Sequence, residues 1–411
     1  MSLSEIDLTN PDNFVHGAPH RWFKQLRSEA PLYWHEEEEG PGFWNVTKYH
    51  DLRQVSRNPH VFSSQRGGTN MRDPRAEERA QFEGQRSFPI MLMMDPPQHV
   101  KFRRIVQRSF TPRFINKLEA HIRELSKQII DNVVERGDCE FVSEVAAELP
   151  LQVICEMMGV PQESRHDIYD ISNRMIGFDD PELAPKDRAE AQGASLQMFQ
   201  HATKTADLYR NNPTDNLTSA LLHKEVDGEK LNEIEYAAFF LLLCVAGNET
   251  TRTVTTNGMK LLIEHPDQLQ ELVDNPALVE SAVEEILRFE PAVHHFRRTA
   301  TQETEIRGHK IRENDKIVMW YPSANRDEEI FDDPDTFDIH RNPNEHLSFG
   351  IGEHFCLGAN LARLELNAIF DEIIPRLRNP QLIGPERRLR SNFINGVKEM
   401  KVSFTPDKAT G

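Results

Sequence analysis

The most constraining feature of this sequence is a single cysteine in a glycine-rich loop near the C-terminal end. The loop runs from Phe349 to Ala359 and reads Phe-Gly-Ile-Gly-Glu-His-Phe-Cys-Leu-Gly-Ala, with Cys356 as its cysteine. The segment that follows is rich in helix formers, and a helix there would point its free amides and positive end toward the sulfur. This arrangement lowers the pKa of a thiol and favours the thiolate, which is the form that binds a metal. Gly352 and Gly358 permit positive φ or a close backbone approach, so we predict that Cys356 is a metal ligand.

The spacing Phe-x-x-Gly-x-x-x-Cys-x-Gly resembles the signature of the cytochrome P450 family of haem-thiolate monooxygenases. A lone cysteine is also compatible with a buried structural role, or with a nucleophile beside His354 as in a cysteine hydrolase. The phenylalanine and glycine register around the cysteine favours haem ligation. The resemblance implies that Cys356 is the axial ligand of a b-type haem, and that Phe349, His354 and Gly358 lie against the same group.

The length of 411 residues, without a linker or an internal repeat, predicts one large domain over residues 1–411. Such a chain can enclose a cofactor and a ligand pocket. The resemblance extends from Trp44 to Phe404 and implies the P450 fold, which is mainly α with small β-sheets, a triangular helical prism around the haem. Helical periodicity predicts helices over most of 118–378, strands at 42–46, 305–307 and 316–319 and near 393 and 402, and a mobile loop over 65–85.

The formal net charge of −18 argues against nucleic acid or an anionic membrane as the main partner. The four cysteines are widely spaced, which excludes a Cys-x-x-Cys zinc or iron–sulfur site and favours a reduced, cytoplasmic protein. The N-terminus is acidic and lacks an apolar run, so we expect no signal peptide. The most apolar stretch, 236–247, is too short to span a bilayer, so we expect no membrane anchor and assign it to a buried helix.

A basic segment follows Asp95-Pro96-Pro97, which predicts a helix start with Asp95 as N-cap. In that helix His99 and Arg103 share one face, and the resemblance implies that both bind haem propionates through charge-assisted hydrogen bonds. On the opposite face we predict a docking site for an acidic ferredoxin-type partner, formed by Lys101, Arg104 and Arg108. A solvated basic face is the alternative for this second group.

The run from Ala246 to Thr251 lies directly after the apolar stretch, hence in the middle of a helix. Gly247 costs about 1 kcal/mol there relative to alanine, so something is expected close to the backbone. Thr250 can donate to the carbonyl of Ala246 and make room for water. The run resembles the family's acid–alcohol pair, which implies that Glu249 and Thr250 deliver protons to iron-bound oxygen and that Ala246 and Gly247 face the haem. An ordinary polar helical turn is the alternative.

Glu285 and Arg288 are three residues apart on a predicted helix, where a bidentate ion pair can form. The resemblance implies a structural Glu–Arg–Arg network with Arg341 that supports the cysteine loop. It also implies that Arg298 is a further propionate partner, together with His354.

The resemblance implies a monooxygenase that takes two electrons from a separate ferredoxin and its reductase and inserts one atom of O2 into a C–H bond. The thiolate favours O–O cleavage, while the protein positions the substrate and the protons. Two alternatives stay open, a peroxygenase driven by hydrogen peroxide and a non-catalytic haem sensor. The acid–alcohol pair argues against the first, and the lack of an output domain in the sequence argues against the second.

The segments that would line the pocket by family resemblance are largely apolar and suit a large lipophilic molecule. Two short runs, 246–252 and 341–344, are similar to members that oxidise sterol side chains and branched lipids. His294 and His295 would bond a polar group of the substrate or else form a surface pair. The predicted pocket residues are Ile90, Met91, Met175, Phe178, Phe239, Leu243, Val293, His294, Phe393 and Ile394.

Overall fold

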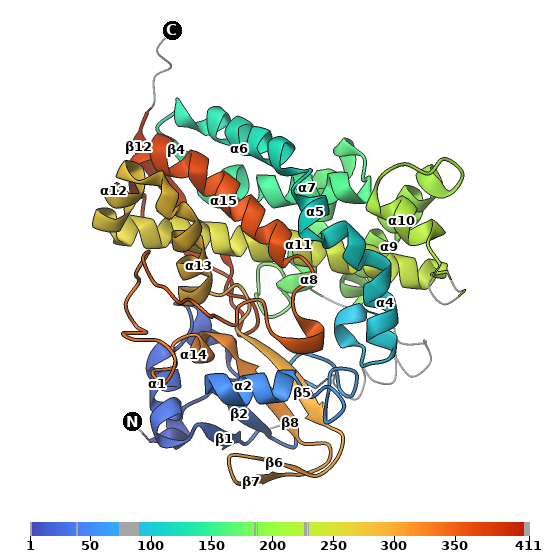
Figure 1. Ribbon diagram of the computed structural model, residues 1–411, viewed down its shortest axis with the longest axis vertical. Coiled ribbons are helices and arrows are strands. Elements are labelled where there is room, and N and C mark those ends of the chain that lie inside the picture. Colours follow the sequence, from blue (N-terminus) through green and yellow to red (C-terminus); the bar gives the residue numbers. More distant parts are fainter. Residues whose placement is uncertain are drawn as a thin grey trace.

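Helices form most of the molecule, and one small sheet packs below them (Figure 1). The structure is a computed structural model that describes residues 2–37, 40–73, 90–184, 186, 188–225, 228 and 230–406. The prediction of a mainly α fold with small β-sheets is confirmed. None of the helices within these ranges is long and apolar enough to cross a membrane.

The helices lie mainly in the middle of the chain. Their bounds are α1 (His20–Glu29), α2 (Tyr49–Ser56), α4 (Gln98–Val106), α5 (Pro112–Ile115), α6 (Glu119–Val134), α7 (Glu148–Met158), α8 (Arg165–Ile176), α9 (Arg188–Arg210), α10 (Leu217–His223), α11 (Glu233–Glu264), α12 (Pro266–Asp274), α13 (Val279–Phe289), α14 (Tyr321–Ala324) and α15 (Ala359–Arg376).

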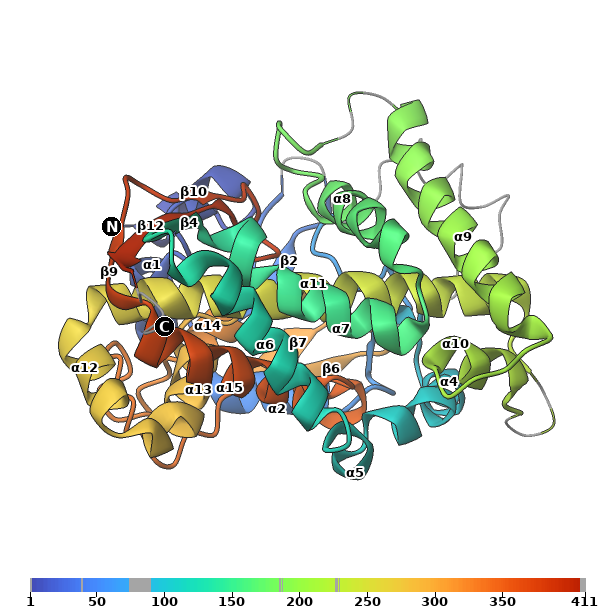
Figure 2. The ribbon, with the colours of Figure 1, turned by 90° about the horizontal axis from the view of Figure 1, so that it is seen from above.

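The long helix α11 crosses the whole helical layer (Figures 1 and 2). It has 32 residues and is therefore about 48 Å long. Asn232 begins it with a capping box, because its side chain accepts from the Ile234 and Glu235 amides while Glu235 reaches back to the Asn232 amide. Helices α7, α8, α9, α13 and α15 all pack on α11. The apolar run predicted to be a buried helix forms its first half.

The main sheet has five strands in the order β1-β2-β8-β5-β3. Only β2 and β8 run parallel in it. Three smaller sheets pair β4 with β12 and β9, β6 with β7, and β10 with β11. The strand bounds are β1 (Leu32–His35), β2 (Phe43–Val46), β3 (Phe62–Ser63), β4 (Asp138–Glu140), β5 (His295–Ala300), β6 (Thr304–Ile306), β7 (His309–Ile311), β8 (Lys316–Trp320), β9 (Arg378–Leu382), β10 (Arg387–Arg388), β11 (Val397–Glu399) and β12 (Lys401–Thr405).

Several local predictions hold and others do not. The strands predicted at 42–46, 305–307, 316–319 and near 402 correspond to β2, β6, β8 and β12. Near 393 there is no strand, only an isolated bridge between Ile394 and Val293. Most of the loop predicted over 65–85 lies outside the described residues.

The predicted start and length of the basic helix need two corrections. Asp95 does not cap α4, since its carboxylate accepts from the Ser64 amide at 2.7 Å and from the Ser63 hydroxyl instead. These bonds tie the start of α4 to the segment after β3. In addition, α4 ends at Val106, and Arg108 lies in a 3-10 turn. Lys101, Arg104 and Arg108 therefore do not form one continuous helical face.

Candidate functional site

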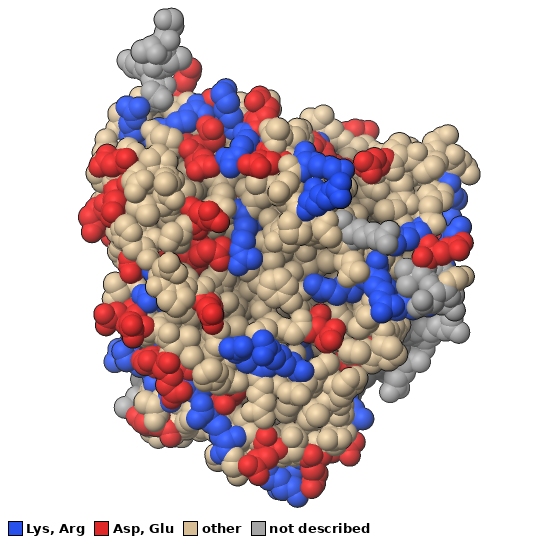
Figure 3. All heavy atoms as spheres, in the orientation of Figure 1, with Lys and Arg blue, Asp and Glu red and all other residues tan. Residues whose placement is uncertain are grey.

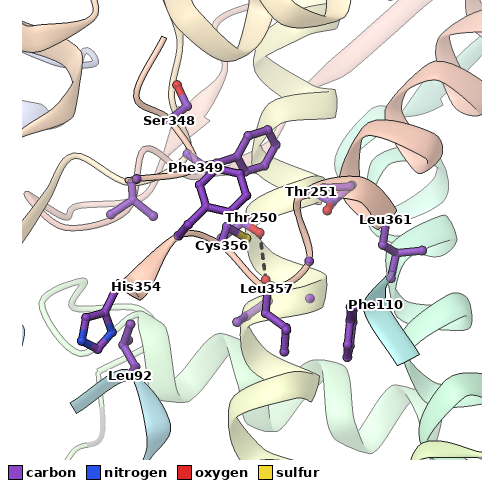
Figure 4. A pocket seen from close by; sticks show the side chains of 18 of the residues that line it. Leu92, Phe110, Thr250, Thr251, Ser348, Phe349, His354, Cys356, Leu357 and Leu361 are labelled. Atoms are coloured by element: carbon purple, nitrogen blue, oxygen red, sulfur yellow. Dashed lines mark hydrogen bonds between the residues drawn. The ribbon is translucent and has the colours of Figure 1, made fainter. Parts of the chain in front are cut away.

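A cavity lies between α11 and the loop that precedes α15 (Figure 4). Its volume is about 250 Å³. One wall is the loop that carries Cys356, and the opposite wall is a single face of α11. The residues of that face are Leu242, Leu243, Ala246, Gly247, Thr250, Thr251 and Val254.

The backbone folds closely around Cys356. Its amide donates to the carbonyl of Phe349 at 2.8 Å, which closes the loop into a compact turn. Burial raises the pKa of the Cys356 thiol, while the amides of Gly358 and Ala359 and the charges of Arg103 and Arg363 act in the opposite direction. The helix start at Ala359 does lower the thiol pKa as predicted, but burial outweighs it. The predicted effect of the helix start is therefore present, and burial is a separate and larger influence that the loop sequence does not reveal.

Gly352 allows this loop to approach α2. It adopts φ +81°, and an added Cβ would lie 2.7 Å from the carbonyl oxygen of Ser56. Any other residue would be strained by both its backbone conformation and this contact. The glycine expected to permit a close approach therefore does so toward protein backbone.

Four basic side chains converge on one end of the cavity, and they are His99, Arg103, Arg298 and His354. Arg298 is 4% exposed and donates to the carbonyl of Arg297 at 2.8 Å. No carboxylate of the described residues forms an ion pair with Arg298 or Arg103. The Nδ1 atom of His99 is buried without a partner. Burial lowers the pKa of His354, and Arg298, His99 and Arg103 lower it further, so this imidazole is neutral.

This end of the cavity fits an anionic group. A buried guanidinium without a counter-ion costs several kcal/mol, so the site favours a ligand that brings carboxylates. The cavity also meets bare backbone at Gly358, where an added Cβ would meet no atom within 4 Å. A flat molecule with two carboxylates and an atom that accepts a thiolate fits these surroundings.

The α11 wall has the small residues that the sequence suggested. The hydroxyl of Thr250 donates to the carbonyl of Ala246 at 2.8 Å, as predicted (Figure 4). An added Cβ at Gly247 would lie 3.1 Å from Cγ1 of Ile154 on α7. The glycine therefore allows close packing of two helices, in addition to its place in the cavity wall.

Glu249 is not among the residues that line the cavity. It is 1% exposed and forms an ion pair with Arg252, whose guanidinium also donates to Oδ1 of Asn173 on α8 at 2.8 Å. Burial raises the pKa of Glu249, and Arg252 opposes this shift. The acid and the alcohol of the predicted pair thus belong to different sides of α11, with only Thr250 in the cavity wall.

The three residues of the predicted structural network lie together. Glu285 and Arg288 form a bidentate ion pair with both distances at 2.7 Å, and both side chains are fully buried. Arg341 donates to the same carboxylate at 3.2 Å. Arg288 also donates to the carbonyls of Asn325 and Pro334 at 2.9 Å. The pair therefore holds the chain that leads into the cysteine loop.

Three of the ten predicted pocket residues line the cavity, and seven do not. Met91, Leu243 and Val293 line the cavity, together with Leu92, Ala292 and Phe296. The other seven are not among its lining residues. Phe239 stacks on Phe102 in the core with centroids 5.5 Å apart, Phe178 is 36% exposed, and Met175 packs against the core; Ile90, His294, Phe393 and Ile394 also lie elsewhere.

His294 and His295 are buried outside the cavity, in contact with aromatic rings. His294 lies 5.1 Å from Phe14, and His295 lies 5.0 Å from Trp320, between ring centroids. His295 is fixed by the carbonyl of Asn392 at 2.9 Å. Neither expected location, the pocket or the surface, matches this place, because both side chains are buried among aromatic rings at the start of β5.

Glu365 is a cavity residue that sequence reasoning missed. It is 2% exposed, its carboxyl group bonds to the side chain of Thr251, and burial raises its pKa to about 8. A carboxyl group that holds its proton at neutral pH is a candidate functional group. The signal in the sequence was an acid among apolar residues, since Leu361, Leu366 and Ile369 share its buried surroundings on α15.

Comparison with known proteins places the chain in a family. The family model described as cytochrome P450 matches residues 53–380, so this chain belongs to the cytochrome P450 family. The prediction of a P450 fold is confirmed. The family implies a haem-iron cofactor, and the cysteine wall and the cationic end of the cavity fit such a group.

Two kinds of relative with stated activities are similar over nearly the whole chain. A steroid C26-monooxygenase of Rhodococcus jostii is 40% identical, covering 97% of this chain and 84% of the relative. A methyl-branched lipid omega-hydroxylase of Mycobacterium tuberculosis is 43% identical, covering 98% and 95%. A solved structure, a Mycobacterium marinum cytochrome P450 in complex with pseudoionone, superposes with a TM-score of 0.89 at 36% identity, covering 97% and 98%. The protein is a cytochrome P450 monooxygenase, which excludes the non-catalytic sensor.

Replacing Glu365 by glutamine tests its protonation. Because its folded-state pKa is about 8 against an ordinary 4.5, the folded protein holds a proton that the unfolded chain releases. This contribution to stability is complete below pH ~4.5 and is lost as pH rises to ~8, at about 1.4 kcal/mol per unit. In urea unfolding, the free energy of unfolding of the wild type should fall by up to ~4 kcal/mol between pH 5 and pH 8 because of this group. Glu365→Gln should lack this part of the fall. Identical pH dependence in variant and wild type would contradict the assignment.

Proposed function

We propose that this protein is a single-domain, b-type haem monooxygenase that hydroxylates an sp³ carbon of a steroid, terpenoid or branched-chain lipid. The observation that carries the substrate class is the apolar wall formed by Met91, Leu92, Leu243, Val293 and Phe296. Burial of a large hydrocarbon against such a wall gives about 25 cal/mol for each Å². The relatives named as steroid and branched-lipid hydroxylases support this class.

The haem, when bound, supplies dioxygen activation and insertion of one oxygen atom into a C–H bond. Cys356 would hold its iron through the thiolate. Arg298, Arg103, His99 and His354 would receive its propionates at the cationic end of the cavity, with Phe349 and Gly358 in the wall beside the sulfur. Ala246 and Gly247 leave room on the α11 side.

Protons would reach the site through α11. Thr250 presents a hydroxyl to the cavity, and its bond to the Ala246 carbonyl fixes the orientation of that hydroxyl. Glu249 would act as the acid behind it, held at rest by Arg252. Movement of Glu249 away from Arg252 would connect solvent on the α8 side with Thr250.

Electrons would come from a ferredoxin-type protein that docks beside the cysteine loop. Arg57, Arg103 and Arg104 line a surface hollow there together with Glu353. Basic side chains gather on this face of the molecule (Figure 3), although the whole chain has a net charge of −18. Lys101 is only partly exposed, and the side chain of Arg108 lies outside the described part, so Arg104 carries the predicted patch. The four free cysteines agree with a reducing compartment such as the cytoplasm.

Turnover with two oxidant systems tests the proposed function. Purified holoenzyme should bind steroids or branched lipids with a spin-state shift at micromolar concentrations or below, and should hydroxylate them with ferredoxin, reductase, NAD(P)H and O2. Hydrogen peroxide alone should give little product, and the opposite result would favour the peroxygenase.

Cys356→Ala should lose the red-shifted Soret band of the reduced carbon-monoxide complex. A variant that kept this band would refute the ligand assignment.

Thr250→Ala should separate binding from coupling. The substitution removes the hydroxyl that orients protons but leaves the apolar wall and the cationic end intact. We expect unchanged haem content and substrate affinity, with several-fold less product for each NAD(P)H consumed and correspondingly more hydrogen peroxide. Thr250→Ser restores the hydroxyl and should recover most of the coupling. Equal coupling in Thr250→Ala and wild type would remove Thr250 from the proton path.

Charge reversal tests the docking surface. Arg57→Glu with Arg104→Glu should slow reduction by ferredoxin roughly tenfold at low salt, because exposed charges mainly steer encounter, and substrate affinity should not change. The difference should shrink as ionic strength rises. Lys204→Glu is the matched control, since Lys204 is exposed on α9 and does not line that hollow. Equal reduction rates in all three proteins would contradict the assignment.

A further inference from the structure

Phe349 begins the cysteine loop and is held by charged groups that the proposed reaction does not use. The guanidinium carbon of Arg363 lies 4.5 Å from the centroid of the Phe349 ring. The imidazole of His346 lies 6.0 Å from the same centroid. The ring itself lines the cavity, and the carbonyl of Phe349 accepts the Cys356 amide. The residue that carries this ring is therefore hydrogen-bonded directly to the cysteine.

Both neighbours of the ring are fixed by one carboxylate, Glu284 of α13. Arg363 donates to it through Nε at 2.6 Å and through a terminal nitrogen at 2.9 Å. Nε2 of His346 contacts the same carboxylate at 3.1 Å. Burial alone would raise the pKa of Glu284, but the hydrogen bonds from Arg363 and His346 lower it to about 2. Glu284 is therefore charged at any physiological pH.

The hydrogen bonds of His346 fix the orientation of its ring. Its Nδ1 accepts from the backbone amide of Ser348 at 3.2 Å, so the proton lies on Nε2 and is donated to Glu284. The cluster thus pairs the positive charge of Arg363 with the negative charge of Glu284.

We propose that Glu284, Arg363 and His346 form a charge-balanced clamp on Phe349 that sets the reduction potential of the iron held by Cys356. Groups around a ligand tune a metal through charge and hydrogen bonding. The three are positioning residues, since they act through Phe349 and Cys356. The proposal depends on the proposed ligation of iron by Cys356.

The clamp makes a prediction about sign that simple structural support does not make. Glu284→Gln keeps the shape of the side chain but leaves the charge of Arg363 uncancelled, which draws electron density from the sulfur and shifts the potential upward. Arg363→Gln leaves the negative charge of Glu284 and shifts the potential downward. The double variant restores neutrality and should return close to the wild-type value. Loosening of the loop would instead shift both single variants in the same direction.

Spectroelectrochemical titration of the substrate-free holoenzyme measures these shifts. Arg363→Lys retains the charge and should shift the potential much less than Arg363→Gln. Glu372→Gln is the matched control, because Glu372 pairs with Arg376 toward the far end of the same helix and should not shift the potential. The reduced carbon-monoxide spectrum is recorded for each protein to verify thiolate ligation.

The outcomes separate the clamp from the proposed function. Opposite shifts in the two single variants, cancelled in the double variant, support the clamp. Shifts in the same direction, or none in either variant, overturn it while the thiolate spectrum persists. If wild type itself lacks the thiolate band, the ligation by Cys356 fails, and the clamp fails with it. If a glutamine variant does not incorporate haem, Arg363→Lys supplies the test, because it keeps the charge. A shift of its potential as large as that expected for the loss of a charge near the sulfur would also overturn the clamp.

Discussion

The buried ion pair between Glu285 and Arg288 is the interaction on which the cysteine loop depends. Moving two charges out of water is unfavourable unless further hydrogen bonds satisfy them. Here Arg288 also donates to backbone carbonyls, and the Glu285 carboxylate accepts hydrogen bonds from Arg341 and Asn344. These bonds connect α13 to the irregular chain between β8 and Cys356. Irregular backbone has no hydrogen-bond ladder of its own, so side chains must fix it. The neighbouring Glu284 extends the same support to the first residue of the loop.

Charge is distributed very unevenly in this protein. The chain is strongly acidic, yet the cavity collects basic groups and contains no acid paired with Arg298 among the described residues. Elsewhere buried cations have carboxylate partners, as Arg27 has Glu328 and Lys48 has Asp327. An anionic cofactor, such as the haem that the family implies, would supply the missing negative charge at the cavity. Haem binding would therefore stabilise the folded state as well as supply its chemistry.

Two buried acids approach the active site from different helices. Glu249 on α11 is held by Arg252 outside the cavity, whereas Glu365 on α15 lies in its wall and bonds to Thr251. Burial raises the pKa of both, but only Glu249 has a cation to oppose the shift. Neighbouring threonines on α11 thus have different partners. Thr250 bonds within its own helix, and Thr251 links α11 to the helix that follows the cysteine.

The sequence by itself determined the class of protein and the ligand candidate, because the family resemblance rests on short motifs, and that resemblance also indicated the groups at the cationic end. The turn around Cys356, the shared face of His99 and Arg103 and the bond from Thr250 to Ala246 are local, and helix and loop geometry suffices to predict them. Tertiary structure decided the remaining features. Burial added a larger opposing influence on the pKa of Cys356, α4 ended before Arg108, and packing beside Phe14 and Trp320 buried His294 and His295. Glu365 and the Glu284 clamp required contacts between distant segments, and such contacts leave no periodic signal in the chain.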